Sequence, residues 1–264
     1  MLFDLTVPEI KSKLQKAGPE EFAALERSLS ADTRKGVVAA LEAARKRIAS
    51  ELEEQRRLDA MFAFEASLAE DRGAQLIVGL DEVGRGPLAG PLAVGAVVLP
   101  RDVRIEGLND SKQVKPDARE LLAERIKAEA LAWDVEFIQP HEIDAAGMTA
   151  SLLLAFRGAV ASIEKQGVVP DIILLDGNPL KMDPREVNVI KGDAKCASIA
   201  AASIVAKVER DALMVAYAQE FPQYGFESNK GYASQDHIDA IKRHGLCPIH
   251  RESFCTAFTQ PTLF

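Results

Sequence analysis

From Gln75 onward, short apolar runs alternate with longer helical stretches, and this alternation limits the chain to an α/β fold. We predict strands at 75–80, 93–99, 133–138, 171–175 and 187–190, and helices at 116–130, 149–165, 197–219 and 235–243. Too few residues join the first two strands for a crossover helix, so we expect those strands to be antiparallel. The later strands follow helices and can run parallel to the first, which predicts a mixed sheet.

The first 72 residues differ from the rest because they are helical in pattern and rich in charge of both signs. We therefore predict a helical N-terminal extension over 1–72 and a main domain over 73–264 that includes a C-terminal helical region. Two roles for the extension stay open. It is either a solvated helical hairpin that covers one side of the core or an accessory contact for nucleic acid or a protein partner.

Composition narrows the class of protein. The apolar fraction is 47%, no run approaches the roughly 20 apolar residues that span a bilayer, and the first residues lack the pattern of a secretion signal, so we expect a cytoplasmic protein without a membrane contact. Cys196, Cys247 and Cys255 are too few for a disulfide framework, and we expect reduced thiols. The net charge of −8 argues against nucleic acid, although bound divalent cations or a local basic face would offset it.

Four acids follow the predicted strands in a way that suggests a shared site. Asp81 and Glu82 come at the end of the apolar run 76–80, Asp176 follows the apolar run 172–175, and Asp193 follows the last predicted strand. Each acid alone has an ordinary explanation as a cap or turn residue. Gathered in one pocket, however, four carboxylates repel unless divalent cations neutralise them, and oxygen ligands favour Mg²⁺ or Mn²⁺ over Zn²⁺.

Such a pair of ions supports hydrolysis of a phosphodiester, because it activates water and stabilises the leaving oxygen. Polar residues that can contact phosphate surround the acids in the sequence, namely Arg85 between Gly84 and Gly86, Lys112, Lys195 and Ser198. Lys112 and Lys195 are equally explained as ordinary surface lysines. Glycines at 84 and 86 let the backbone approach a ligand closely.

Other nucleotide-binding motifs are excluded. The glycines at 84, 86 and 90 have the spacing Gly-x-Gly-x-x-x-Gly and feed another strand, which disfavours a dinucleotide fold, and no P-loop sequence is present.

Tyr232 lies in a polar, glycine-bearing loop, where it either stacks on a base or sugar or packs on its own loop. His244, Cys247, His250 and Cys255 match no standard zinc motif, so we expect ordinary packing there, and we expect His237 to be a capping or core residue.

From about Leu76 to Phe254 the chain resembles bacterial ribonuclease HII. The segments that carry the resemblance are 79–91, Asp110-Ser111-Lys112, Leu175-Asp176-Gly177, 191–195, 198–207 and Lys230-Gly231-Tyr232. The helical extension resembles that of longer bacterial members. The resemblance implies a ribonuclease H-like fold, with a five-stranded mixed sheet flanked by helices.

The resemblance also implies roles for individual residues. The metal-binding acids would be Asp81, Glu82, Asp176 and Asp193. As a hypothesis of our own, one ion is shared by Asp81 and Asp176, and the second is near Glu82 and Asp193. Gly84, Arg85 and Gly86 would read the ribose 2′-hydroxyl, the group that distinguishes RNA from DNA, and Tyr232 would stack under the sugar on the 3′ side.

The implied substrates are RNA:DNA hybrids and duplex DNA with embedded ribonucleotides, cut on the 5′ side of the ribonucleotide to leave a 3′-hydroxyl and a 5′-phosphate during ribonucleotide excision. A non-catalytic hybrid-binding module is the alternative. The sister enzyme, ribonuclease HIII, usually lacks the arginine between these glycines and has a β-containing N-terminal domain, so Arg85 and the helical extension favour HII. Cys196 stands where a small polar residue is common, which suggests sensitivity to oxidants. We expect a monomer, because the fold needs no partner to complete its core.

Overall fold

The structure, a computed structural model, describes residues 5–259 and contains a five-stranded mixed sheet with the order β3-β2-β1-β4-β5. The strands are β1 (Ile77–Val83), β2 (Leu92–Val98), β3 (Ala132–Ile138), β4 (Ile172–Asp176) and β5 (Glu186–Val189). β1 pairs antiparallel with β2 and parallel with β4. The expectation of a mixed α/β sheet is confirmed.

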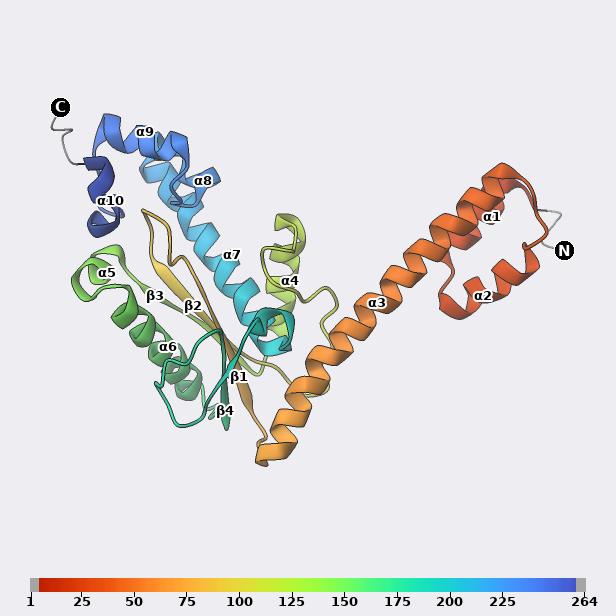
Figure 1. Ribbon diagram of the computed structural model, residues 1–264, viewed down its shortest axis with the longest axis horizontal. Helices are drawn as coiled ribbons and strands as arrows, with labels where there is room; N and C mark the ends of the chain where they lie inside the picture. The colour runs from red at the N-terminus through yellow and green to blue at the C-terminus, as the bar shows by residue number, and fades with distance from the viewer. Residues whose placement is uncertain (1–4, 260–264) are drawn as a thin grey trace. The chain divides into compact units, whose positions relative to one another are not determined.

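Helices cover both faces of the sheet (Figure 1). α5 (Pro140–Ala146) and α6 (Met148–Lys165) lie on one face, and α4 (Pro116–Glu129) and α7 (Ala197–Glu220) lie on the other. α6 buries Phe156 and Ile163 in one core with Val78 and Leu80 of β1. The apolar side chains at helical spacing on α6 therefore form one core with this face of the sheet.

α7 approaches the sheet unusually closely because glycines lie beneath it. A Cβ atom on Gly79 would stand 2.2 Å from the carbonyl carbon of Ser198, and one on Gly95 would stand 2.3 Å from the carbonyl oxygen of Ala202. Real Cβ atoms do not come so close to backbone. The alanine-rich first half of α7 and these two glycines thus bring the helix backbone directly against β1 and β2.

The C-terminal region is helical, as expected. Its elements are η3 (Pro222–Tyr224), α8 (Phe226–Asn229), α9 (Gln235–His244) and α10 (Glu252–Thr259). They pack with the end of α7 around Tyr224, Phe226 and Met214. Sequence reasoning did not predict α5, α8 or α10, which are short. None of the helices within residues 5–259 has both the length and the apolar character needed to span a lipid bilayer.

The N-terminal residues form a compact unit of their own. It contains α1 (Val7–Lys16), α2 (Pro19–Ser28) and the first part of α3 (Lys35–Arg72). Its core gathers apolar side chains from all three helices, including Leu14, Phe22 and Leu41. The described residues up to Asp59 belong to this unit and those from Ala60 belong to the second unit, so the division between the two compact units lies inside α3.

Candidate active site

Asp81 and Glu82 lie inside β1 and not at its end, which differs from our expectation. β1 continues to Val83, and Asp81 and Glu82 pair with Gly95 and Val94 of β2. Because successive side chains of a strand point to opposite faces, Asp81 shares the face of Gly79, which is the α7 face, and Glu82 points to the other. The apolar run therefore predicted where the acids lie along the chain but not that they face different sides.

Asp176 is the last residue of β4, the parallel neighbour of β1. Leu175 pairs with Leu80, so Asp176, at the carboxyl end of β4, stands beside Asp81 on the parallel strand β1. One Asp176 oxygen accepts a hydrogen bond of 2.7 Å from the amide of Gly192. Gly192 begins the short helix η2 (Gly192–Ala194), which carries Asp193. Gly192 therefore links Asp176 to Asp193, because its amide bonds to the first acid and it directly precedes the second in the chain.

The acids perturb one another. Burial, together with the charges of Glu82 and Asp176, raises the pKa of Asp81 from 3.8 to about 8, although a hydrogen bond with the Ser203 hydroxyl opposes the shift. Burial also raises the pKa of Glu82 and of Asp193, and Asp176 adds to both shifts. A group of carboxylates that interact this strongly holds negative charge that the fold itself does not fully neutralise.

Positive groups near the acids are few and largely exposed. Arg85 contacts a Glu82 oxygen at 3.1 Å, and its side chain is 60% exposed. Lys112, which is exposed, lowers the pKa of Asp193, whereas Asp110 of the same loop raises it. The loop that contains Asp110 and Lys112 therefore faces the acids. Arg85 and Lys112 are available to contact a phosphate without leaving a buried ion pair.

Sequence reasoning missed Ser203 and the loop residues Asp110 and Ser111 as neighbours of the acids. Ser203 lies on α7. Its hydroxyl is hydrogen-bonded to the Asp81 carboxyl group and lies 3.0 Å from the hydroxyl of buried Ser111. A serine within an alanine-rich helix has no distinctive local signal. Only the close packing of α7 on β1 brings it to the acid.

The acids do not form a closed metal cage. Within residues 5–259, no three carboxylate, imidazole or thiol side chains are arranged to hold one ion together. An all-protein cage is the expected arrangement for a structural metal, whereas Mg²⁺ commonly binds through one or two carboxylates, several waters and the phosphates of a substrate. The oxygen-only donors, their mutual repulsion and the open arrangement fit an ion of that kind.

The turn after β1 is held from behind by two fully buried arginines, Arg210 and Arg251. Arg251 donates to the carbonyls of Gly84, Arg85 and Gly90 at 2.6 to 3.0 Å. Arg210 donates to the carbonyls of Pro91 (2.9 Å), Lys230 (3.0 Å) and Ala89 (3.2 Å). Sequence reasoning did not single out either arginine, because arginines are rarely fully buried.

Tyr232 lies next to this turn with 43% of its surface exposed. The carbonyl of the preceding residue, Gly231, accepts hydrogen bonds from the amides of Leu88 (2.8 Å) and Ala89 (3.3 Å). Gly231 has φ +85°, and a Cβ atom there would stand 2.2 Å from the Ala89 carbonyl oxygen, so only glycine fits. The loop that contains Tyr232 (the tyrosine loop) is therefore packed against the turn that follows β1 (the glycine turn), and the two hold each other in place.

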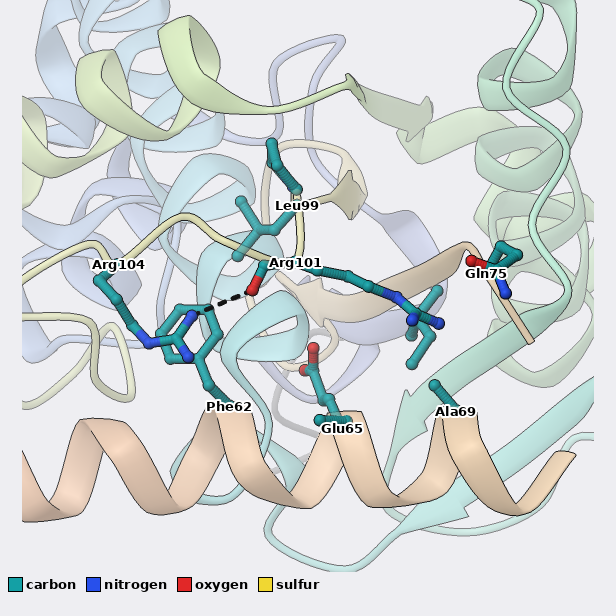
Figure 2. A pocket seen from close by; sticks show the side chains of 10 residues that line it. Phe62, Glu65, Ala69, Gln75, Leu99, Arg101 and Arg104 are labelled. Atoms are coloured by element: carbon teal, nitrogen blue, oxygen red, sulfur yellow. Dashed lines mark hydrogen bonds between the residues drawn. The ribbon is translucent and has the colours of Figure 1, made fainter. Parts of the chain in front are cut away.

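Ser198 has a different role from the phosphate contact that we expected. It is 1% exposed, and both its amide and its hydroxyl donate 2.8 Å hydrogen bonds to one oxygen of Glu65. Glu65 extends from α3 into a pocket bordered by Phe62, Arg101 and Arg104 (Figure 2). It caps the amino end of α7, where Cys196 provides no side-chain cap. Lys195, one residue before Cys196, stays exposed.

The C-terminal histidines and cysteines contribute to the packing around Tyr224 and Phe226. His237 Nδ1 lies 2.8 Å from the Tyr232 carbonyl and His237 Nε2 lies 3.1 Å from His250 Nε2. His250 Nδ1 accepts from the amide of Cys247 at 2.9 Å. Because carbonyls only accept and the Cys247 amide only donates, this chain of bonds is complete with both imidazoles neutral. Burial lowers the pKa of both histidines, that of His250 to about 4.

Cys196 is fully buried, and burial raises the pKa of its thiol. Glu65 and Asp176 raise it further through their charge. Oxidation proceeds through the exposed thiolate, so this thiol is protected. The expectation of an oxidant-sensitive site is therefore not supported by its surroundings.

Two family models and a curated relative match most of this chain. The family model "Ribonuclease HII" matches residues 78–257, and the model "Ribonuclease HII N-terminal domain" matches residues 6–69. Ribonuclease HII of Listeria monocytogenes serotype 4a is 40% identical over 249 residues, which is 94% of this chain and 94% of the relative.

Two solved structures show the same fold. The ribonuclease H2 of Pyrococcus horikoshii OT3 is 27% identical with a TM-score of 0.57, over 71% of this chain and 100% of that one. A Bst ribonuclease HIII solved in complex with Mn²⁺ is 19% identical with a TM-score of 0.51, over 70% of this chain and 66% of that one. The second likeness concerns the fold alone.

Proposed function

The chain belongs to the ribonuclease HII family, and we propose from this premise that it nicks duplex DNA on the 5′ side of single embedded ribonucleotides. Membership makes it an endoribonuclease that acts on the RNA strand of RNA:DNA hybrids. The proposed products carry a 3′-hydroxyl and a 5′-phosphate.

The observation that carries the proposal is the set of interacting acids on β1, at the end of β4 and on η2. Burial and acidic neighbours raise the pKa of Asp81 to about 8, so a bound cation would stabilise its ionised carboxylate. We propose that Asp81, Glu82, Asp176 and Asp193 together hold Mg²⁺ or Mn²⁺. When bound, such ions supply activation of water and stabilisation of the leaving 3′ oxygen.

The chain's own residues would position the substrate. Asp81 and Asp176 stand side by side on parallel strands and would fix the scissile phosphate relative to the sheet. Arg85, largely exposed beside Glu82, would contact a phosphate, and Lys112 would do the same from its loop. Lys195 is exposed at the end of η2 and remains a candidate for a more distant phosphate. Ser198 is not among the proposed contacts, because Glu65 occupies its hydrogen-bonding groups.

Sugar recognition would come from the glycine turn and from Tyr232. A Cβ atom on Gly86 would have no heavy atom within 4 Å, and its φ is not in the left-handed region, so packing does not demand glycine there. Open space at a position without a side chain suits close approach by a ribose. Tyr232, exposed and adjacent through Gly231, would stack on the neighbouring sugar.

The alternative is a module that binds hybrids without cutting them. To separate the two, an RNA:DNA hybrid is incubated with the protein in Mg²⁺, in Mn²⁺ and in excess EDTA, and binding and strand scission are measured in the same samples. We expect scission in either cation and none in EDTA. Binding with intact strands under every condition would support the binding module instead.

A further inference from the structure

Arg251 has an environment that the catalytic acids do not explain. Its guanidinium is fully buried, lies 5.3 Å from the centre of the Phe254 ring, and directs its hydrogen bonds at backbone carbonyls. Burial and the nearby Arg210 lower its pKa to about 9. Burying a cation without a directly paired carboxylate is costly, and here it is offset by contacts that all fall on one turn.

These contacts determine which way two peptide groups face. Arg251 Nη2 donates to the Gly84 carbonyl at 2.6 Å, and Nη1 donates to the Arg85 carbonyl at 3.0 Å. No cis peptide bond occurs among the described residues, and in a trans peptide the N–H points opposite to the C=O. The amides of Arg85 and Gly86, which belong to these two peptides, therefore point away from Arg251.

The two amides are available to a ligand. Both residues are exposed, and neither amide has a hydrogen-bond partner among residues 5–259. Gly84, with φ +90°, allows the chain to turn at the point where the first carbonyl meets Arg251. Two successive backbone amides on the same side of a turn form a small site for an electronegative atom.

We propose that Arg251 is a positioning residue for ribose recognition, which holds the Gly84 and Arg85 carbonyls so that the following two amides face the 2′-hydroxyl of the substrate. This inference rests on the proposed function, because it assigns that function's sugar selectivity to a buried side chain that touches no substrate. Arg210 has a separate task, since its contacts join the turn to the tyrosine loop.

The test measures selectivity and not activity alone. Arg251→Lys retains a charge but cannot span three carbonyls. Ile249→Ala is the matched control, because Ile249 is buried in the C-terminal apolar cluster two residues before Arg251 and its side chain makes none of the guanidinium contacts. Both changes are made in an Asp176→Asn protein, which is expected to bind without cutting. Affinity is measured for two duplexes of identical sequence, one with a single ribonucleotide and one entirely of DNA.

We expect Arg251→Lys to reduce the ratio of ribonucleotide to all-DNA affinity about fivefold to tenfold, the value of one or two hydrogen bonds. Ile249→Ala should leave this affinity ratio unchanged, even if it lowers the melting temperature by as much as Arg251→Lys does. An unchanged ratio in Arg251→Lys, or an equal loss in Ile249→Ala, would overturn the inference. If the Asp176→Asn parent shows no preference for the ribonucleotide, the proposed function fails as well.

A second measurement applies even if Arg251→Lys does not fold. The Asp176→Asn protein is labelled with ¹⁵N at arginine and glycine and titrated with each duplex. The amide signals of Arg85 and Gly86 should shift with the ribonucleotide duplex and respond much less to the all-DNA duplex. Equal responses of both amides to the two duplexes would contradict the proposed orientation.

Discussion

Asp176 accepts a 2.7 Å hydrogen bond from the amide of Gly192, the residue directly before Asp193. This bond joins the end of β4 to η2, so two acids that are 17 positions apart in the sequence depend on each other for their placement. A substitution that removes the charge of Asp176 but keeps an acceptor oxygen should therefore preserve the arrangement.

Asp176→Asn is such a substitution. We expect cleavage of an RNA:DNA hybrid to fall by at least about 100-fold, the scale on which single electrostatic groups act in catalysis, while hybrid affinity stays within a few fold. Single-turnover cleavage and a binding titration measure the two quantities. Asp236→Asn, at an exposed position in the first turn of α9, is the control and should cleave normally. Full activity in Asp176→Asn would remove this acid from the mechanism.

Asp81 should make the metal-free protein less stable as the pH rises. Its pKa is raised from 3.8 to about 8 in the folded state, so the folded protein retains a proton that the unfolded chain releases. The Asp81 contribution to the free energy of unfolding should fall between about pH 4 and pH 8, by an amount on the order of a few kcal/mol. Below about pH 6.5 the titration of His250 opposes this fall, so the slope is measured between pH 6.5 and pH 8 by thermal unfolding in EDTA. Asp81→Asn should remove most of that slope while abolishing cleavage.

Divalent cations should reverse the same effect. Mg²⁺ replaces a proton as the partner of the Asp81 carboxylate, so its stabilisation should be larger at pH 8 than at pH 6. The measurement is the shift in melting temperature on adding Mg²⁺ at each pH. An equal shift at both values, or one that persists in Asp81→Asn, would show that the cation stabilises the protein elsewhere.

Glu65 should stabilise the protein through its capping of α7. Glu65→Ala leaves the amide and hydroxyl of Ser198 without their partner, and we expect a loss of about 1 to 2 kcal/mol in the free energy of unfolding. Glu65→Gln keeps an acceptor oxygen and should lose less. Chemical denaturation of both, beside the exposed control Glu70→Ala on the same helix, measures the difference. Glu65→Ala and Glu70→Ala with equal stability would exclude the cap.

The neutral histidine pair should make the protein sensitive to acid. The pKa of His250 is lowered from 6.5 to about 4, so the unfolded chain takes up a proton more readily than the folded one. The stabilisation is complete above about pH 6.5 and is lost as the pH falls toward 4. The full loss is on the order of 3 kcal/mol. Unfolding is followed in an Asp81→Asn background, and adding His250→Asn should flatten the curve over this range.

The sheet was predictable because its strands are apolar runs between turn signals, and the short link between β1 and β2 required an antiparallel pair. The sequence also predicted that the four acids lie on or near strands. Their orientation was not predicted, because β1 continues past Asp81 and alternates its side chains between the two faces.

Local sequence patterns do not predict which residues support the site, because the supporting contacts join residues far apart in the chain. The position of Ser198 at the start of a helix predicts a phosphate contact, yet its partner Glu65 is 133 positions away, in a helix that the sequence pattern places in the extension. Arg210 and Arg251 have no local sequence signal that singles them out. Only the folded chain shows that both are buried and that their hydrogen bonds shape the glycine turn.

The most direct test uses a DNA duplex that contains one ribonucleotide, labelled at the 5′ end of that strand. It is incubated with the protein in Mn²⁺ or Mg²⁺, beside an all-DNA duplex and an EDTA control, and the products are resolved at single-nucleotide resolution. We predict one cut on the 5′ side of the ribonucleotide, with a 3′-hydroxyl on the labelled fragment, and no cut in either control. An intact ribonucleotide strand in both cations, or a cut that persists in EDTA, would contradict the account.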